Sequence, residues 1–108
     1  MPNDVRTTTR AKRDMHRVYN WYRKNASQRE ADRWYNGIMR SLDQLKRDPD
    51  RFSVIHEDDE FGVEFREMLY GSGRRKTHRV IFAIRPDAVI VHAVRHFAQD
   101  DLTLDDLQ

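Results

Sequence analysis

The sequence of 108 residues contains no cysteine, which excludes disulfide bonds and thiolate chemistry. It has no apolar run close to the roughly 20 residues that a membrane-spanning helix needs. The N-terminal stretch MPNDVRTTTRAKRD lacks the apolar region of a signal peptide. Internal repeats and low-complexity segments are also missing. We therefore expect a single domain over residues 1–108, located in the reducing cytoplasm.

Charge is unevenly distributed along the chain. The net charge is only +2, but residues 1–48 carry +6, residues 49–70 carry −5, residues 71–96 carry +5 and residues 97–108 carry −4. Basic blocks attract phosphate groups or an acidic partner. The turn GSGRRK concentrates three cations, Arg74, Arg75 and Lys76, but it lacks the strand–helix context of a phosphate-binding glycine loop.

Two helices are predicted in the first half of the chain. Thr8 or Thr9 can cap the first helix, and Ser27 with Glu30 forms a capping box for the second. Apolar residues then recur at helical spacing, at Ala11, Met15, Val18, Tyr19 and Tyr22 and at Ala31, Trp34, Tyr35, Ile38, Leu42 and Leu45. The second helix is expected to run from about Gln28 to Arg47. The short link between the helices predicts an antiparallel hairpin.

Strands are predicted around this helical hairpin. Residues 5–9 are β-branched except for Arg6, and they fit a first strand. Val63, Phe65 and Leu69 alternate with polar positions, and residues 79–96 form two further strands around a Pro-Asp turn. The expected order is β-α-α-β-β-β, an α+β fold with the N-terminal helical hairpin packed on one face of a small, mainly antiparallel sheet. The other face is expected to stay more open, and the tail from about residue 97 is expected to be acidic.

The last hairpin has a predicted register. A two-residue loop at Pro86-Asp87 pairs Ile84 with Val89, Phe82 with Val91 and Val80 with Ala93, which gathers the apolar side chains on one face. By the same alternation Arg79, His92 and His96 should share the open face, together with Arg66. His92 and His96 would then lie about 13 Å apart along one strand, too far to share a metal ion. No metal or cofactor is expected.

Three segments together resemble a known family. They are FREMLYG at residues 65–71, RVIFAI at 79–84 and DAVIVHAVRH at 87–96, which follow the helical hairpin. In order and spacing the chain is similar, over roughly residues 9–100, to toxins of the RelE/ParE superfamily of bacterial type II toxin–antitoxin systems. The resemblance implies a small toxin that is neutralised by a bound antitoxin. RelE-like members cut mRNA on the ribosome without a metal, and ParE-like members inhibit DNA gyrase.

The two branches of the family imply different roles for this chain. The long second helix, and the absence of any tyrosine after Tyr70 or lysine after Lys76, favour the ParE-like, plasmid-stabilisation type. Arg66, Arg79 and His96 nevertheless match positions where ribonuclease branches carry catalytic groups. Glu57, Glu60 or Glu64 could supply a carboxylate like the one that such branches use. Histidine suits proton transfer near neutral pH, and arginine suits a scissile phosphate.

Three functions therefore follow as alternatives. The first is a growth-arresting toxin that binds a protein such as DNA gyrase and forms a hetero-oligomer with its antitoxin. The second is a metal-independent endoribonuclease that acts on the ribosome and its mRNA. The third is a basic nucleic-acid-binding module without enzymatic action. The residues expected to contact phosphate or a partner are Arg74, Arg75, Lys76, His92 and Arg95.

Overall fold

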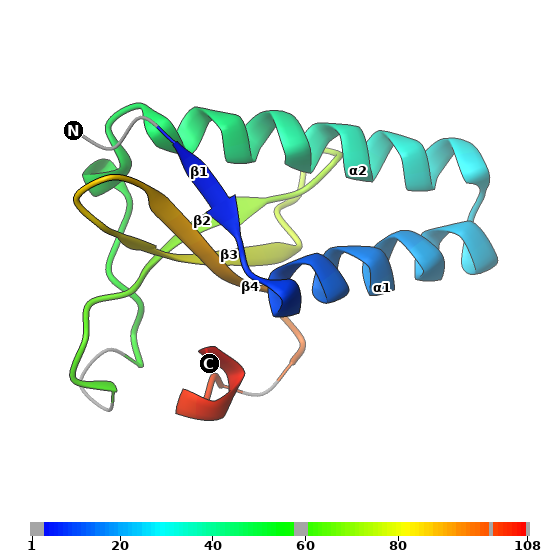
Figure 1. The fold of residues 1–108 in the computed structure, drawn as a ribbon. Helices are drawn as coiled ribbons and strands as arrows, with labels where there is room; N and C mark the ends of the chain where they lie inside the picture. The colour runs from blue at the N-terminus through cyan, green and yellow to red at the C-terminus, as the bar shows by residue number, and fades with distance from the viewer. Residues whose placement is uncertain (1–3, 58–60, 100, 108) are drawn as a thin grey trace.

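The computed structural model describes residues 4–57, 61–99 and 101–107 of the chain, so that Glu60 lies outside the described residues. The regular elements are β1 (Val5–Thr7), α1 (Thr9–Asn25), α2 (Gln28–Asp43), β2 (Arg66–Tyr70), β3 (His78–Ile84) and β4 (Val89–His96). Three short 3₁₀ helices accompany them: η1 (Gln44–Lys46), η2 (Pro49–Arg51) and η3 (Leu104–Leu107). The predicted β-α-α-β-β-β order is thereby confirmed (Figure 1).

Both helices begin at the predicted caps. The Thr8 hydroxyl oxygen accepts a hydrogen bond from the Ala11 N–H at 3.0 Å, and the Ser27 hydroxyl accepts one from the Glu30 N–H at 3.1 Å. The α-helical part of α2 ends at Asp43, earlier than predicted, because its last turn tightens into η1. Within the described residues, neither helix is both long and apolar enough to cross a membrane.

The four strands form one sheet in the order β1-β4-β3-β2. β3 runs antiparallel to both of its neighbours, whereas the short β1 runs parallel to β4 with Val5 opposite Val89. The sheet is thus mainly antiparallel, as expected. The parallel pair places the start of the chain beside its last strand (Figure 1).

The register of the β3–β4 hairpin follows the prediction only near the turn. Ile84 lies opposite Val89 and Phe82 opposite Val91, but a bulge then shifts the pairing so that Val80 faces Val94 instead of Ala93. His92 is the extra residue of this bulge, because Ile81 pairs with Ala93. Beyond the bulge, side chains of β4 therefore point to the faces opposite to those predicted.

The main hydrophobic core lies between the helical hairpin and one face of the sheet. Trp34 of α2 is completely buried there, and its carbonyl oxygen accepts a hydrogen bond from the Tyr70 hydroxyl at 2.8 Å. Gly37 leaves room for that hydroxyl, since a Cβ at this position would lie 2.1 Å from it. The buried members are Ala11, Met15, Trp34, Ile38, Leu42, Leu45, Met68, Tyr70, Val80, Phe82, Val89, Val91 and Val94.

The prediction that the second face of the sheet stays open is wrong. A second core covers this face, formed by the segment between η2 and β2 and by the C-terminal tail. The described part of the tail ends in η3, and Leu102 and Leu107 are buried because they cover apolar strand residues, whereas Leu104 is exposed. The members of this core are Ile55, Phe61, Phe65, Ile81, Ala83, Ala93, Leu102 and Leu107.

Candidate functional site

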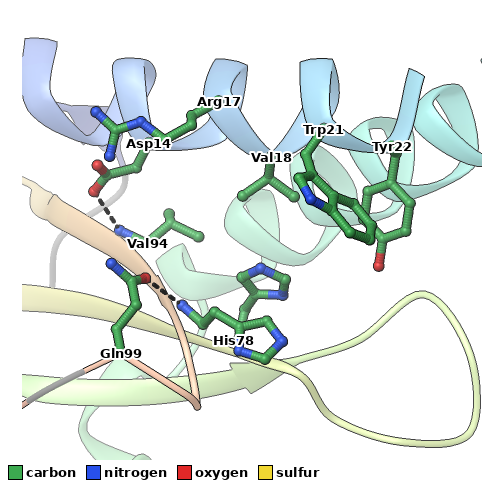
Figure 2. Close-up of a pocket in the computed structure, with 9 residues that line it drawn as sticks. Asp14, Arg17, Val18, Trp21, Tyr22, His78, Val94 and Gln99 are labelled. Carbon is green, nitrogen blue, oxygen red and sulfur yellow. Dashed lines mark hydrogen bonds between the residues drawn. The ribbon is translucent and has the colours of Figure 1, made fainter. Parts of the chain in front are cut away.

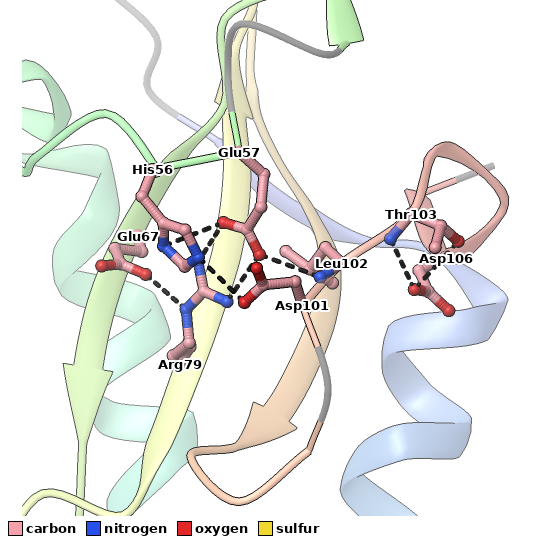
Figure 3. A network of polar contacts seen from close by, with 8 residues as sticks. All are labelled: His56, Glu57, Glu67, Arg79, Asp101, Leu102, Thr103 and Asp106. Carbon is pink, nitrogen blue, oxygen red and sulfur yellow. Dashed lines mark hydrogen bonds and ion pairs between the residues drawn. The ribbon is translucent and has the colours of Figure 1, made fainter.

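Arg79, the first expected phosphate ligand, is engaged within the chain. It lies on β3 under the second core, where its guanidinium donates two hydrogen bonds to Glu57, at 3.0 and 2.8 Å, and a further one to Glu67 (Figure 3). The side chain of Arg79 is 12% exposed and that of Glu57 is 2% exposed. The hydrogen bonds that Arg79 donates to Glu57 are the main cause that raises the pKa of Arg79. Its cation is thus neutralised by two carboxylates.

Glu57 joins three parts of the chain. Besides Arg79, it accepts a hydrogen bond from the backbone N–H of Leu102 at 2.9 Å and lies 3.2 Å from a ring nitrogen of His56. Burial by itself would raise the pKa of Glu57, but the hydrogen bonds from Arg79 and Leu102 outweigh it and hold the pKa at about 2. Glu57 is therefore a permanent anion that fastens the tail and the connecting segment to the sheet.

The same group of residues contains potential metal ligands. Within the described residues, His56, Glu57 and Asp101 offer ligand atoms that all lie within 4.8 Å of one another. Both carboxylate oxygens of Glu57 already accept hydrogen bonds from Arg79, whose positive charge opposes a second cation. We therefore treat the cluster as a polar network that supports the tail.

Arg66, the second expected phosphate ligand, does not join Arg79. It shares the helix-facing side of β2 with Met68 and Tyr70, because these two residues, and not Phe65 and Leu69, point toward the helices. Its guanidinium donates to the carbonyl oxygens of Asp50, at 3.1 Å, and Phe52, and it pairs with Glu64 at 2.8 Å. The placement of Arg66 on the same face as Arg79 was thus wrong.

His96 lies at the end of β4, opposite His78. The alternation that pairs Arg79 with Arg95 puts His96 on the helix-facing side of the sheet, so the shared face predicted for Arg79 and His96 is also wrong. Both residues border a hollow of about 270 Å³ at the end of the strands. The ring Nδ1 of His96 accepts a hydrogen bond from the Ala98 N–H at 2.9 Å.

The expected partner-binding residues fall into two groups. Arg74, Arg75 and Lys76 are exposed in the turn between β2 and β3. His92 and Arg95 instead lie beneath the tail, where His92 Nδ1 is 3.1 Å from the Leu107 carbonyl oxygen and Arg95 is 3.5 Å from a carboxylate oxygen of Asp106. Burial is the main cause that lowers the pKa of His92. Of these five expected residues, the three turn cations are the ones directly available to a partner.

A pocket of about 450 Å³ lies between α1 and the ends of β3 and β4 (Figure 2). Helix α1 contributes Asp14, Arg17, Val18, Trp21 and Tyr22. The opposite side is formed by His78, Val94, His96 and Gln99. The sequence did not predict this site. The sequence feature that could have indicated this pocket is Asp14, a carboxylate that lies between the apolar helix positions Ala11, Met15 and Val18.

Two titratable groups in this pocket are strongly influenced by their surroundings. Burial, with a smaller contribution from the neighbouring His96, lowers the pKa of His78 to about 4. The rings of His78 and His96 lie 5.1 Å apart. Burial raises the pKa of Asp14, although its carboxylate accepts a hydrogen bond from the Val94 N–H at 3.0 Å. His78 is therefore neutral near pH 7, and Asp14 ties α1 to β4.

Comparisons with known proteins agree with this architecture. The family model described as "ParE toxin of type II toxin-antitoxin system, parDE" matches residues 5–101. A solved structure titled "Chromosomal ParDE TA system from P. aeruginosa" is similar in fold, with a TM-score of 0.68 and 13% sequence identity over 86% of this chain and 94% of that chain. Comparison with curated proteins gives no match. Since the family model spans nearly the whole chain, the protein belongs to the ParE toxin family of type II toxin–antitoxin systems.

Proposed function

We propose that this ParE-family toxin arrests growth by binding a protein target, with DNA gyrase as the leading candidate, and that a cognate antitoxin neutralises it in a hetero-oligomeric complex. The family membership supports this proposal directly. Such a toxin acts in the cytoplasm, where both its target and its antitoxin are found. Its action requires an accessible binding surface and does not require an assembled catalytic site.

The observation that carries this proposal is the engagement of Arg79 and Arg66. Metal-independent cleavage of RNA needs cations that hold the scissile phosphate, together with an acid and a base. Each nitrogen of the Arg79 guanidinium donates a hydrogen bond to Glu57 or Glu67, and Arg66 donates to backbone carbonyl oxygens on the other side of the sheet. Freeing Arg79 for a phosphate would leave the buried Glu57 without its partner, which is strongly unfavourable.

The antitoxin surface that we propose is the exposed side of the helical hairpin. It carries many exposed cations, namely Lys12, Arg13, Arg17, Arg23, Lys24, Arg29, Arg33 and Arg40. An acidic antitoxin segment that orders on contact would complement this charge. The second face of the sheet is less suitable, because the chain's own tail already covers it.

The test is a supercoiling assay with purified toxin and purified gyrase. We expect the toxin to inhibit supercoiling and the cognate antitoxin, added in equal amount, to restore it. An Arg79→Ala variant gives no information here unless its folding is verified, and Leu69→Ala serves as the control at an exposed residue outside the helical hairpin and the basic turn. Full gyrase activity at saturating toxin would contradict the gyrase target.

The ribonuclease alternative has a separate test. Purified toxin added to a translating extract should leave the mRNA intact under our proposal. Cleavage that depends on His96, lost in a His96→Ala variant and kept in Arg74→Ala, would instead assign the protein to the RNA-cleaving branch.

A further inference from the structure

The pocket beside α1 adjoins the proposed antitoxin surface at Arg17, and it combines aromatic walls with free hydrogen-bonding groups. We propose that this pocket binds a purine mononucleotide, with its base against Trp21 and its phosphate at Arg17. The inference does not rest on gyrase inhibition, since binding to the purified chain is measured by itself. Its volume of about 450 Å³ falls in the usual range of ligand pockets, roughly 300–1,000 Å³.

The aromatic part of the pocket comes from α1. Trp21 is 58% exposed although it is the largest side-chain type, and it meets Tyr22 edge to face at 5.4 Å. Figure 2 shows both rings reaching from the helix toward the sheet, on the side where His78 lies. Val18 and Val94 add apolar surface. An exposed tryptophan at the mouth of a partly apolar pocket is well suited to stack on a planar ring.

The hydrogen-bonding groups fit the edge of a purine base. His78 is neutral, and its Nδ1 lies 2.7 Å from the Thr77 hydroxyl, which itself reaches the Tyr70 carbonyl oxygen at 3.5 Å. In that arrangement the Thr77 oxygen accepts from Nδ1, so His78 Nε2 is a free acceptor. Asp14 has a second carboxylate oxygen beside the one that Val94 occupies. Two acceptors thus face the pocket for the amino group of a base.

Donors are present on the same side. His96 Nδ1 accepts from the Ala98 N–H, so the neutral ring carries its proton on Nε2 and donates from there. Gln99 uses its carbonyl oxygen for the His96 N–H at 2.7 Å, which leaves its NH₂ group available. These donors match the ring nitrogens of a purine, which are acceptors.

The pocket offers one cation for a phosphate. Among the described residues that line it, Arg17 is the one with a permanent positive charge, and the Asp14 carboxylate on the same helix offers no site for a second phosphate. Proteins that bind a nucleic-acid strand instead use a groove of cations along the backbone and several stacking rings. A ligand with one base and one phosphate therefore fits better than a strand.

The experiment is a calorimetric titration of AMP into the purified full-length protein. We expect saturable binding that Trp21→Ala weakens roughly tenfold or more and that Trp21→Tyr largely restores, because tyrosine also stacks. Arg17→Ala should weaken AMP binding and leave the weaker binding of adenosine unchanged. Leu69→Ala and Arg74→Ala alter exposed residues outside the pocket and should bind AMP like the unmodified chain.

Several results would overturn the proposal. The first is the absence of saturable binding at millimolar AMP, and the second is equal affinity in Trp21→Ala. If Arg74→Ala weakened AMP binding as much as Arg17→Ala does, the binding would be nonspecific electrostatic attraction. Much tighter binding of a short oligoadenylate than of AMP would assign the pocket to a strand instead. Trp21 and Arg17 are both exposed, so their variants should fold, which circular dichroism verifies.

Discussion

Arg79 and Glu57 are joined by two parallel hydrogen bonds, from Nη1 to Oε2 at 3.0 Å and from Nη2 to Oε1 at 2.8 Å. Such a two-point contact between a guanidinium and a carboxylate fixes orientation as well as distance. Because Glu57 also binds the Leu102 N–H, the pair connects the sheet, the connecting segment and the tail. An arginine that the sequence suggested for phosphate binding thus has a structural partner.

Removal of Arg79 should strongly destabilise the fold. Arg79→Ala leaves the Glu57 carboxylate buried without its cation, which costs about 3–5 kcal/mol of unfolding free energy. Urea denaturation measures this loss. Arg74→Ala, which removes an exposed cation, should change stability by less than about 0.5 kcal/mol. Equal effects of the two substitutions would contradict the structural role of Arg79.

Acid should weaken the protein through Glu57. Its pKa is about 2 in the folded state against an ordinary value of 4.5, so the unfolded chain binds the proton more tightly. The associated stability is fully present above about pH 4.5 and is lost as the pH falls toward 2. Its size is about 3 kcal/mol, since each tenfold change in proton affinity is worth about 1.4 kcal/mol. Chemical denaturation at pH values from about 5 to about 2 measures this loss of stability. The Glu57→Gln variant should show a weaker dependence of stability on pH over this range.

His78 should cause a separate loss of stability on acidification, in a higher pH range than the loss caused by Glu57. Its folded pKa of about 4 lies below the ordinary value of 6.5, so protonation favours the unfolded chain. The stability is present above about pH 6.5 and declines as the pH falls to 4, by up to about 3 kcal/mol. His78→Gln should remove this slope in urea denaturation. His16→Gln, at an exposed histidine on α1, should retain it, and retention in both variants would refute the assignment.

Gly37 and Tyr70 should be energetically coupled. In an ordinary helix Gly→Ala stabilises by about 1 kcal/mol, but here the new Cβ would lie 2.1 Å from the Tyr70 hydroxyl. We therefore expect Gly37→Ala to destabilise by about 1–3 kcal/mol. In a Tyr70→Phe background, which lacks the hydroxyl, the same substitution should cost clearly less. Four urea curves complete this double-mutant cycle, and simple additivity would exclude the coupling.

The helices and the order of the elements along the chain could be predicted from local signals. Thr8 and Ser27 fit helix caps by chemistry alone, and the apolar spacing from Ala31 to Leu45 fits one face of a helix. The faces of the strands could not be assigned in the same way. The segment FREMLY has apolar residues at the positions of both strand faces. Phe65 and Leu69 belong to one face, and Met68 and Tyr70 belong to the other. Since both faces of this sheet are covered, neither set identifies the helix side.

The bulge at His92 is the second reason why the site differed from the prediction. One extra residue reverses every later side chain of β4, and no glycine in DAVIVHAVRH marks its position. His96 therefore lies on the helix-facing side, next to His78, and not on the side that was predicted. Glu57 was proposed only as one of three acidic residues, because sequence alone does not reveal which carboxylate becomes buried against an arginine.

The pairing of β1 with β4 has a consequence for synthesis. Val5 and Val89 are neighbours in the sheet but are separated by most of the chain. A ribosome that adds about 5–20 residues per second needs several seconds to produce the second partner after the first. Trp34 packs against Tyr70 and His78, so the helical hairpin cannot bury this side chain until β2 and β3 have also been made. The nascent chain therefore lacks its complete sheet and part of its main core during most of its translation.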